Sequence, residues 1–189
     1  LMRTIPGMTV IVPCDAHETY LATQAILQAK GPCYLRTGRG PVETVTDGFS
    51  DYSFTIGKGI TLTDGMDVTI IACGLMVQEA LKAQKLLEAE EIQARVIDMH
   101  TIKPIDKELI LKAAKEPTAI VNAEENKVIR GLGSAVAEVL AASEPVPVEF
   151  VGVKDVFGHS GSPRELLERY KLTPKQIAAC AKKAIGRKK

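Results

Sequence analysis

The stretch DVTIIACGLMVQEALKAQKLLEAEEIQARVIDMHTIKPID, residues 67–106, decides the fold of this 189-residue chain. Its positions 68–72 are apolar and rich in β-branched residues, which is typical of a strand buried on both faces. Beyond Gly74 the apolar residues of 77–87 recur at helical spacing, and 95–99 returns to a strand pattern. Two parallel strands need a crossover connection, so this stretch predicts a right-handed βαβ unit.

Upstream, the sequence predicts a second, smaller βαβ unit. Residues 8–12 and 33–36 are typical of strands, and CDAHE at 14–18 indicates a turn into a helix that ends near residue 29, with Asp15 as its N-cap. One such unit cannot close its own core. We therefore expect residues 1–40 to be the remnant of a larger domain, and a naturally short domain is the alternative.

Downstream, residues 41–56 are expected to form a linker and 57–189 a complete domain. Asp64-Gly65 predicts a hairpin-type turn that adds an antiparallel edge strand to the sheet. The remaining pattern alternates strands and helices, which favours a three-layer α/β/α domain with a mixed, mostly parallel five-stranded sheet. Its expected strands are 59–63, 68–72, 95–99, 118–123 and 147–153, and its further helices are 105–115, 131–143, 166–170 and 174–185.

The composition narrows the possible partners. Hydrophobic residues make up 46% and charged residues 25% of the chain, while aromatic residues make up 4% and the net charge is +1. Scarce aromatics and a balanced charge argue against nucleic-acid binding. No apolar run approaches the roughly 20 residues of a membrane span. The four cysteines show no CxxC spacing and no signal peptide is visible, so we expect a cytoplasmic protein without membrane or nucleic-acid partners.

The loop LRTGRG, residues 35–40, is the first candidate binding site. Arg36 and Arg39 follow a predicted strand and stand among glycines. Ligands of open α/β sheets bind beyond the carboxyl ends of strands, and guanidinium groups hold phosphate bidentately. Both arginines are therefore candidates for binding a substrate phosphate. The alternative is that they pair with carboxylates of the linker or of a partner.

The second candidate is the helix start at Gly131 and Gly133, in EENKVIRGLGSAV, residues 124–136. Helix N-termini attract anions, so these glycines mark a possible anion site. Tight packing of the helix on the sheet is the favoured alternative, because the third glycine of a dinucleotide fingerprint is missing. Glu124 and Glu125 would face opposite ways on a strand, which makes them a poor catalytic pair.

Other chemistry-bearing residues give weaker patterns. Three histidines are scattered without metal-ligand spacing, so no metal site is expected: His17, His100 and His159. The segment DVFGHSGS, residues 155–162, lacks the glycine elbow of a serine nucleophile and is interpreted as a polar surface loop rather than an Asp155–His159–Ser160 triad. Cys73 is expected to be an inert, buried thiol. No catalytic residue is assigned.

Several blocks agree, in order and spacing, with one family. The first two resemble the end of the pyrimidine-binding middle domain of transketolases, and the others resemble the transketolase C-terminal domain. The blocks are MRTIPGMTVIVPCDAHE (2–18), GPCYLRTGRG (31–40), IGKG (56–59), DVTIIACGLMVQEALKA (67–83), RVIDMHTIKPID (95–106), EENKVIRGLGSAVAEVL (124–140) and GVKDVFGHSGSPRELLERYKLT (152–173). TIKPID and FGHSG are closer to transketolase than to deoxyxylulose-phosphate synthases or the β subunits of 2-oxoacid dehydrogenases.

The resemblance implies an enzyme that uses thiamine diphosphate to move a two-carbon ketol unit between sugar phosphates. In that family the cofactor lies at a dimer interface, its diphosphate and Mg²⁺ bind an N-terminal domain, and the activating glutamate belongs to the early middle domain. Of the family's functional residues only the phosphate-binding arginine is carried over, to Arg39, or to Arg36 if the short glycine loop shifts the alignment. Asn126 stands where the family often has histidine.

The resemblance therefore implies the C-terminal portion of a transketolase, possibly of a split one. Such a chain is expected to bind no cofactor by itself, to be inactive alone, and to act with an N-terminal portion or subunit in a homodimer on sugar phosphates. Two alternatives remain open. One is the corresponding part of a deoxyxylulose-phosphate synthase or a 2-oxoacid dehydrogenase β subunit. The other is a non-enzymatic α/β module that binds a regulator at the Gly131 helix start.

Overall fold

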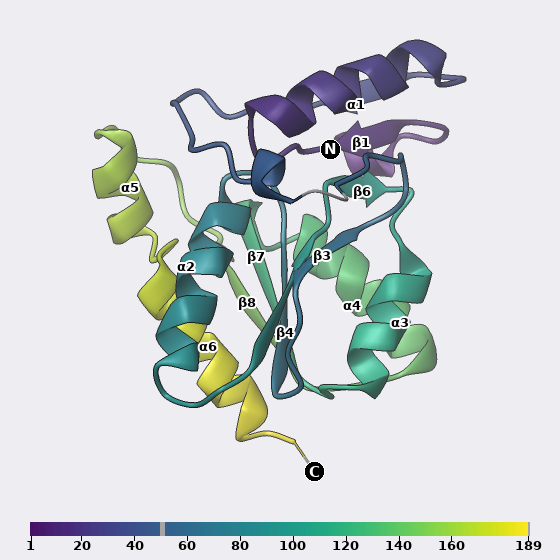
Figure 1. The fold of residues 1–189 in the computed structure, drawn as a ribbon. Coiled ribbons are helices and arrows are strands. Elements are labelled where there is room, and N and C mark those ends of the chain that lie inside the picture. The colour runs from purple at the N-terminus through teal and green to yellow at the C-terminus, as the bar shows by residue number, and fades with distance from the viewer. Residues whose placement is uncertain (50–51, 189) are drawn as a thin grey trace.

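The structure is a computed structural model that describes residues 1–49 and 52–188, and it contains two β-sheets (Figure 1). The strands are β1 (Thr9–Ile11), β2 (Cys33–Leu35), β3 (Ile60–Thr63), β4 (Val68–Ala72), β5 (Ala94–Asp98), β6 (Thr101–Lys103), β7 (Ile120–Lys127) and β8 (Val148–Val153). The α-helices are α1 (Ala16–Gln28), α2 (Met76–Glu88), α3 (Lys107–Lys115), α4 (Leu132–Ser143), α5 (Pro163–Arg169) and α6 (Pro174–Ile185), with 3₁₀ turns at Met2–Thr4 (η1) and Thr46–Gly48 (η2).

The large sheet has the strand order β3-β5-β4-β7-β8 and confirms the predicted mixed, mostly parallel sheet. β4 pairs in parallel with both β5 and β7, β8 is parallel to β7, and β3 is antiparallel at the edge. Helices α2 and α6 cover one face, and α3 and α4 cover the other (Figure 1). The domain is therefore the three-layer α/β/α sandwich that the sequence predicts.

The central strand β4 shows why the opening stretch folds as it does. All its residues are buried. Ile70 packs into the core under α2 and α6, while Ile71 packs into the core under α3 and α4, because neighbouring strand residues point to opposite faces. Each fully buried side chain of this kind contributes about 1.5–3 kcal/mol. Gly74 follows with a φ of +56°, which lets the chain turn sharply into α2.

The hairpin predicted at Asp64-Gly65 is wrong. β3 is an edge strand, as expected, but it pairs antiparallel with β5 and not with the next strand, β4. Both edges of β4 are already occupied by β5 and β7. Gly65 lies against the backbone of residues 93–95, where an added Cβ would come within 2.5 Å of the Ala94 carbonyl carbon. The turn therefore carries the chain past the start of β5 before β4 begins.

The small sheet has the order β2-β1-β6, and the sequence did not predict β6. β1 pairs in parallel with β2, as a βαβ unit requires, and antiparallel with β6, which follows β5 almost directly. Lys103 strengthens this junction because its ammonium donates to the carbonyls of Arg3 and Ile5 at 3.1 and 2.7 Å. The division into 1–40, 41–56 and 57–189 stays a prediction, and backbone hydrogen bonds cross it.

Two other boundaries differ from expectation by more than two residues. β7 continues to Lys127, beyond the predicted end at residue 123. α5 begins at Pro163 instead of 166, because Ser162 and Glu165 form a capping box at its start. Within the described residues, no helix is long and apolar enough to cross a membrane. Positions 50 and 51 of the predicted linker, and the last residue of the predicted C-terminal domain, lie outside the described residues.

Candidate functional site at the carboxyl edge of the sheets

Arg36 and Arg39 lie just beyond the carboxyl end of β2, but the structure gives them different surroundings. The Arg36 guanidinium donates to the backbone carbonyl of Glu125 at 2.9 Å and lies 3.8 Å from that residue's carboxylate. Arg36 is thereby tied to the end of β7. Arg39 is exposed and forms no ion pair with the residues that the structure describes. The phosphate role of both arginines stays a prediction, and Arg39 is the more available of the two.

A cavity of about 280 Å³ lies beside Arg36. Its walls include Cys73 at the end of β4 and Glu124 on β7. The strand order of the large sheet reverses between β4 and β7, since β5 lies on one side of β4 and β7 on the other. Open α/β sheets bind ligands at such a switch point. The arginines and apolar side chains around this cavity include Arg3, Arg36, Arg130, Val10, Val12, Tyr34, Ile102 and Leu132.

Glu124 already occupies the helix start that the sequence marked as a possible anion site. Its carboxylate accepts hydrogen bonds from the N–H groups of Leu132 and Gly133, at 2.9 and 3.0 Å. Burial raises the pKa of Glu124, and these two N–H donors oppose that shift. A ligand at Gly131 and Gly133 would have to displace this carboxylate. The anion-site hypothesis stays untested, but the two N–H groups have an internal partner.

The same glycines show the tight packing that the sequence offered as the alternative. A Cβ added at Gly133 would come within 2.6 Å of the Phe150 ring on β8, and one at Gly131 would overlap the Glu124 carboxylate. Both positions therefore need glycine so that α4 can approach the sheet closely. Sequence reasoning considered Glu124 only as a member of a catalytic pair, and missed its role as a helix cap.

The turn between β1 and α1 is held by Asp15. Its carboxylate caps α1 by accepting from the N–H of Glu18 at 2.8 Å, and it also accepts from the N–H groups of Val45 and Thr46, each at 2.8 Å. Burial alone would raise the pKa of Asp15, but the backbone hydrogen bonds from Glu18, Thr46 and Val45 lower it below its ordinary value. The predicted cap is confirmed, and it also fastens residues 45–46 to α1.

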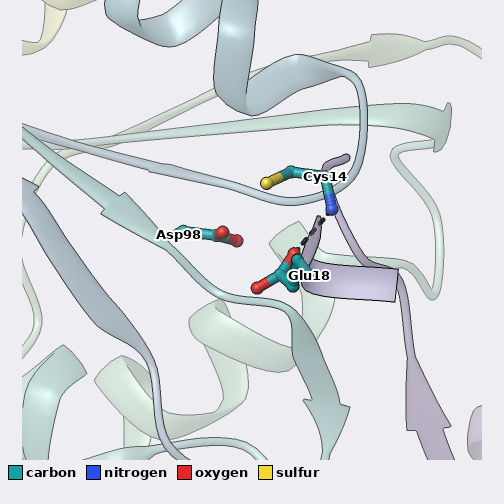
Figure 2. A group of neighbouring side chains, drawn as sticks. All are labelled: Cys14, Glu18 and Asp98. Atoms are coloured by element: carbon teal, nitrogen blue, oxygen red, sulfur yellow. Dashed lines mark hydrogen bonds between the residues drawn. The ribbon is translucent and has the colours of Figure 1, made fainter. Parts of the chain in front are cut away.

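Beneath this turn the structure brings together three groups that sequence reasoning did not connect. Figure 2 shows Cys14, Glu18 and Asp98, whose ligand atoms lie within 4.8 Å of one another. All three are buried. Burial is the largest cause that raises the pKa of each of these groups. No sequence signal pointed to the cluster, because Asp98 lies eighty positions beyond Glu18, at the end of β5, while Glu18 belongs to α1.

This cluster does not suit the Mg²⁺ of a thiamine-diphosphate enzyme. Mg²⁺ prefers oxygen ligands and keeps several of its waters, whereas this site offers a thiol and is closed to solvent. Glu18 also already accepts from the N–H of Cys14 at 2.6 Å and from the hydroxyl of Tyr52. We therefore derive no catalytic step through this cluster.

The histidines are not gathered into a site among the described residues. His17 lies 2.9 Å from the Thr46 hydroxyl, and His100 is buried and stacks on Phe54 with ring centroids 4.1 Å apart. Burial lowers the pKa of His100 to about 4. His159 lies in an exposed loop beside the Tyr170 hydroxyl, at 2.9 Å.

The rejected triad does not form. Asp155 pairs with Lys127 at 3.2 Å rather than with His159, and residues 154–162 are exposed, as a surface loop should be. Cys73 is buried, and burial raises its pKa well above the ordinary value of a thiol. Both findings agree with the sequence-based interpretation.

Comparison with known proteins identifies the family. The sequence profile described as the transketolase C-terminal domain matches residues 57–177. A solved structure described as a split gene transketolase, inactive beta4 tetramer, matches with a TM-score of 0.95 and 49% identity, covering 100% of this chain and 61% of that one. A transketolase structure from Pichia stipitis, 23% identical with a TM-score of 0.76, shares the fold over 97% of this chain and 26% of its own.

Curated relatives agree. The 6-deoxy-6-sulfo-D-fructose transketolase subunit of Clostridium sp. (strain MSTE9) is 45% identical, over 100% of this chain and 58% of its own length. An apulose-4-phosphate transketolase subunit of Phocaeicola vulgatus is 40% identical, over 96% and 57%. A 1-deoxy-D-xylulose-5-phosphate synthase of Symbiobacterium thermophilum is 37% identical, over 98% of this chain but 29% of its own length. The chain thus spans little more than half of the transketolase subunits it matches, and it belongs to the transketolase C-terminal domain family.

Proposed function

We propose that this chain is the C-terminal part of a thiamine-diphosphate-dependent transketolase that transfers a two-carbon ketol unit between sugar phosphates. The observation that carries the proposal is the match along the whole chain to a split-gene transketolase subunit, at 49% identity and a TM-score of 0.95. Two curated relatives are likewise named as transketolase subunits. The proposal also places the protein in the cytoplasm.

The cofactor is proposed to bind in the complete enzyme rather than to this chain. The cluster of Cys14, Glu18 and Asp98 does not suit Mg²⁺, and the sequence carries no diphosphate-binding motif. An N-terminal portion or subunit would hold thiamine diphosphate and Mg²⁺. The whole enzyme would be a homodimer in which each half consists of that portion and this chain. The related β4 tetramer is described as inactive, which supports the proposal that this chain is inactive without that partner.

Arg39 is proposed to bind the phosphate of the sugar substrate. It is exposed beyond the carboxyl end of β2, between Gly38 and Gly40, where backbone can approach a ligand closely. Arg36 is proposed to anchor the same loop, because it holds the end of β7 through Glu125. Arg39 would therefore supply the substrate contact, and Arg36 would fix its position.

Reconstitution tests the proposal. The full-length protein that contains this sequence would be assayed for ketol transfer alone and after mixing with the matching N-terminal subunit, thiamine diphosphate and Mg²⁺. We expect transfer only in the mixture. Transfer by the protein without that subunit would contradict the proposed division of labour. The substrate panel should include phosphorylated ketoses together with apulose 4-phosphate and 6-deoxy-6-sulfo-D-fructose, the sugars in the relatives' names.

A pair of arginine variants tests the substrate contact in the reconstituted enzyme. A charge-assisted hydrogen bond contributes about 1.5–3 kcal/mol, so Arg39→Ala should raise KM for phosphorylated substrates roughly 10- to 100-fold. Arg164→Ala is the matched control, because Arg164 is equally exposed but lies on α5, far along the chain from the loop. Equal KM values for the two variants would show that Arg39 does not bind the substrate phosphate.

The similarity to 1-deoxy-D-xylulose-5-phosphate synthase supports a second candidate function. In that case the reconstituted enzyme would consume pyruvate and would not need a ketose donor. Supplying pyruvate in place of the donor therefore separates the two functions. The 2-oxoacid dehydrogenase alternative would also consume pyruvate, and its products differ. A regulator site at Gly131 is less favoured, since Glu124 fills that helix start.

A further inference from the structure

Two carboxyl groups from distant parts of the chain meet in a region closed to water. Glu18 comes from the first turn of α1, and Asp98 is the last residue of β5 (Figure 2). Both side chains are fully buried, with 0% of their surface exposed. One oxygen of each carboxyl group and the Sγ of Cys14 lie within 4.8 Å of one another. Two like charges this close in a low-dielectric interior cannot both persist, so one group has to stay neutral.

The hydrogen bonds identify which group carries charge. Both Glu18 oxygens accept hydrogen bonds, one from the N–H of Cys14 at 2.6 Å and one from the hydroxyl of Tyr52. Two donors on two oxygens suit an ionised carboxylate, which can only accept. Asp98 shows the opposite situation, because neither of its oxygens has a partner among the described residues. An ionised carboxylate left without donors in the interior would be strongly unfavourable.

We propose that Glu18 and Asp98 share one proton, held mainly by Asp98, and that this proton fastens the turn before α1 to the carboxyl end of β5. A protonated Asp98 becomes a donor, and Glu18 and Cys14 each place an acceptor atom within 4.8 Å of it. The pair is a positioning device. It fixes the start of α1, and Asp15 in the same turn then holds residues 45 and 46.

Among the described groups that face Glu18 and Asp98, no side chain supplies a positive charge. The shared proton therefore balances the second negative charge of the pair. Cys14 and Asp15 belong to the turn itself, Tyr52 comes from the linker, and Cys73 follows β4. Each is acidic or neutral, and none supplies a positive charge. Burial first, and then the charge of Glu18, raise the pKa of Asp98. Burial also raises the pKa of Glu18, against the hydrogen bonds from Tyr52 and Cys14.

The sign of the pH dependence follows from these directions. A carboxyl group whose pKa is raised in the folded protein binds its proton more tightly there than in the unfolded chain. The contribution of this pair to the free energy of unfolding is therefore largest at low pH. It is lost as the pH rises from the pKa of the unfolded chain through that of the folded protein. The turn before α1 should loosen from β5 as the pH rises through the folded pKa, since that is where the second negative charge appears in the folded protein.

The first test looks for the proton itself. Infrared difference spectra of the full-length protein should show the C=O band of a protonated carboxylic acid at neutral pH, and Asp98→Asn should lose it. Glu18→Gln should keep the band, because burial is the largest cause that raises the pKa of Asp98 and it remains when the Glu18 charge is removed. Glu168→Gln, an exposed acid on α5, is the control that should keep the band. A wild-type spectrum without the band would overturn the proposal.

The second test measures thermal unfolding between about pH 5 and about pH 9. The wild-type Tm should fall with rising pH more steeply than that of Asp98→Asn, whose amide stays neutral. Equal slopes for the two proteins would overturn the proposal. If Asp98→Asn fails to fold, Glu18→Gln serves instead, and its Tm should fall over a lower pH range than that of the wild type.

A third measurement distinguishes a proton from a bound metal ion. Zn²⁺ would be added to the full-length wild-type protein and to Asp98→Asn, and the Tm of both recorded. An unchanged Tm in the wild type agrees with a shared proton. A rise in the wild type that Asp98→Asn abolishes, together with loss of the infrared band, would show that a cation balances the pair and would overturn the proposal.

Discussion

Glu124 and Asp98 are buried acids of neighbouring regions, each toward the carboxyl end of a strand in the same sheet, yet they are stabilised in different ways. Glu124 accepts hydrogen bonds from two backbone N–H groups at the start of α4. Asp98 has no hydrogen-bond partner among the described residues and faces a second carboxyl group instead. The hydrogen-bond donors around a buried acid, rather than its position on the sheet, therefore determine whether it carries a charge.

Replacing Glu124 should have the largest effect. Glu124→Ala would leave the N–H groups of Leu132 and Gly133 without partners in the interior, which we expect to lower the free energy of unfolding by about 2–4 kcal/mol. Urea denaturation measures this change. Glu125→Ala is the control, since Glu125 is partly exposed and its loss should cost less than about 1 kcal/mol. Equal losses for the two variants would mean that the carboxylate is not the cap.

Asp15 contrasts with Asp98, because the pKa of Asp15 is lowered whereas that of Asp98 is raised. Its carboxylate has three backbone donors, and Asp15→Ala should lower the free energy of unfolding by about 1–2 kcal/mol at neutral pH. A lowered pKa means that this stability is present above the unfolded pKa and is lost as the pH falls through the folded one. Urea denaturation from about pH 7 down to about pH 3 should therefore show the two proteins converging. A difference that stays constant across this range would contradict the assignment.

Asp98→Asn should show the reverse trend. The wild-type free energy of unfolding should fall by at most about 1.4 kcal/mol per pH unit as the shared proton is lost, and the variant should lack this component. The free energy of unfolding of the variant, relative to that of the wild type, should thus increase as the pH rises. Urea denaturation of both proteins at matched pH values measures this difference. A variant that is less stable than the wild type by the same amount at every pH would indicate a purely steric role for Asp98.

Gly133→Ala should have the smallest effect. The added Cβ would press on the Phe150 ring and push α4 away from the N–H···Glu124 hydrogen bonds, at a cost of about 1 kcal/mol because Phe150 is partly exposed and can shift. Gly158→Ala is the control, since no atom lies within 4 Å of a Cβ there. If thermal unfolding shows no difference between the two variants, close approach of α4 does not support the Glu124 cap.

The sequence predicts the fold where the chain has a long, regular period. The strand–helix–strand stretch through Gly74 is confirmed because a buried β-branched run and a helical stripe each leave a repeating pattern. The turn at Asp64-Gly65 was misjudged because a local turn signal does not say which strand becomes the partner. β6 was missed because three residues beside a proline are too short to show a period.

The candidate site was less predictable, for a related reason. Asp15 as an N-cap is a local pattern and is confirmed. The cap of Glu124 on α4 spans eight residues and depends on the exact bend of the chain after β7. The contact between Glu18 and Asp98 depends on how the first βαβ unit packs against the large sheet, and no spacing in the sequence encodes that packing.

The three-residue strand β6 also bears on what would happen if the chain were cleaved. Because β1 pairs with β6 and Arg36 holds Glu125, the N-terminal fragment would stay attached by contacts that do not depend on the covalent linker. A protein nicked between residues 41 and 45 should therefore co-elute as one particle in size-exclusion chromatography and separate only in denaturant. Fragment complementation, with the two pieces expressed from separate genes, becomes feasible at the same position.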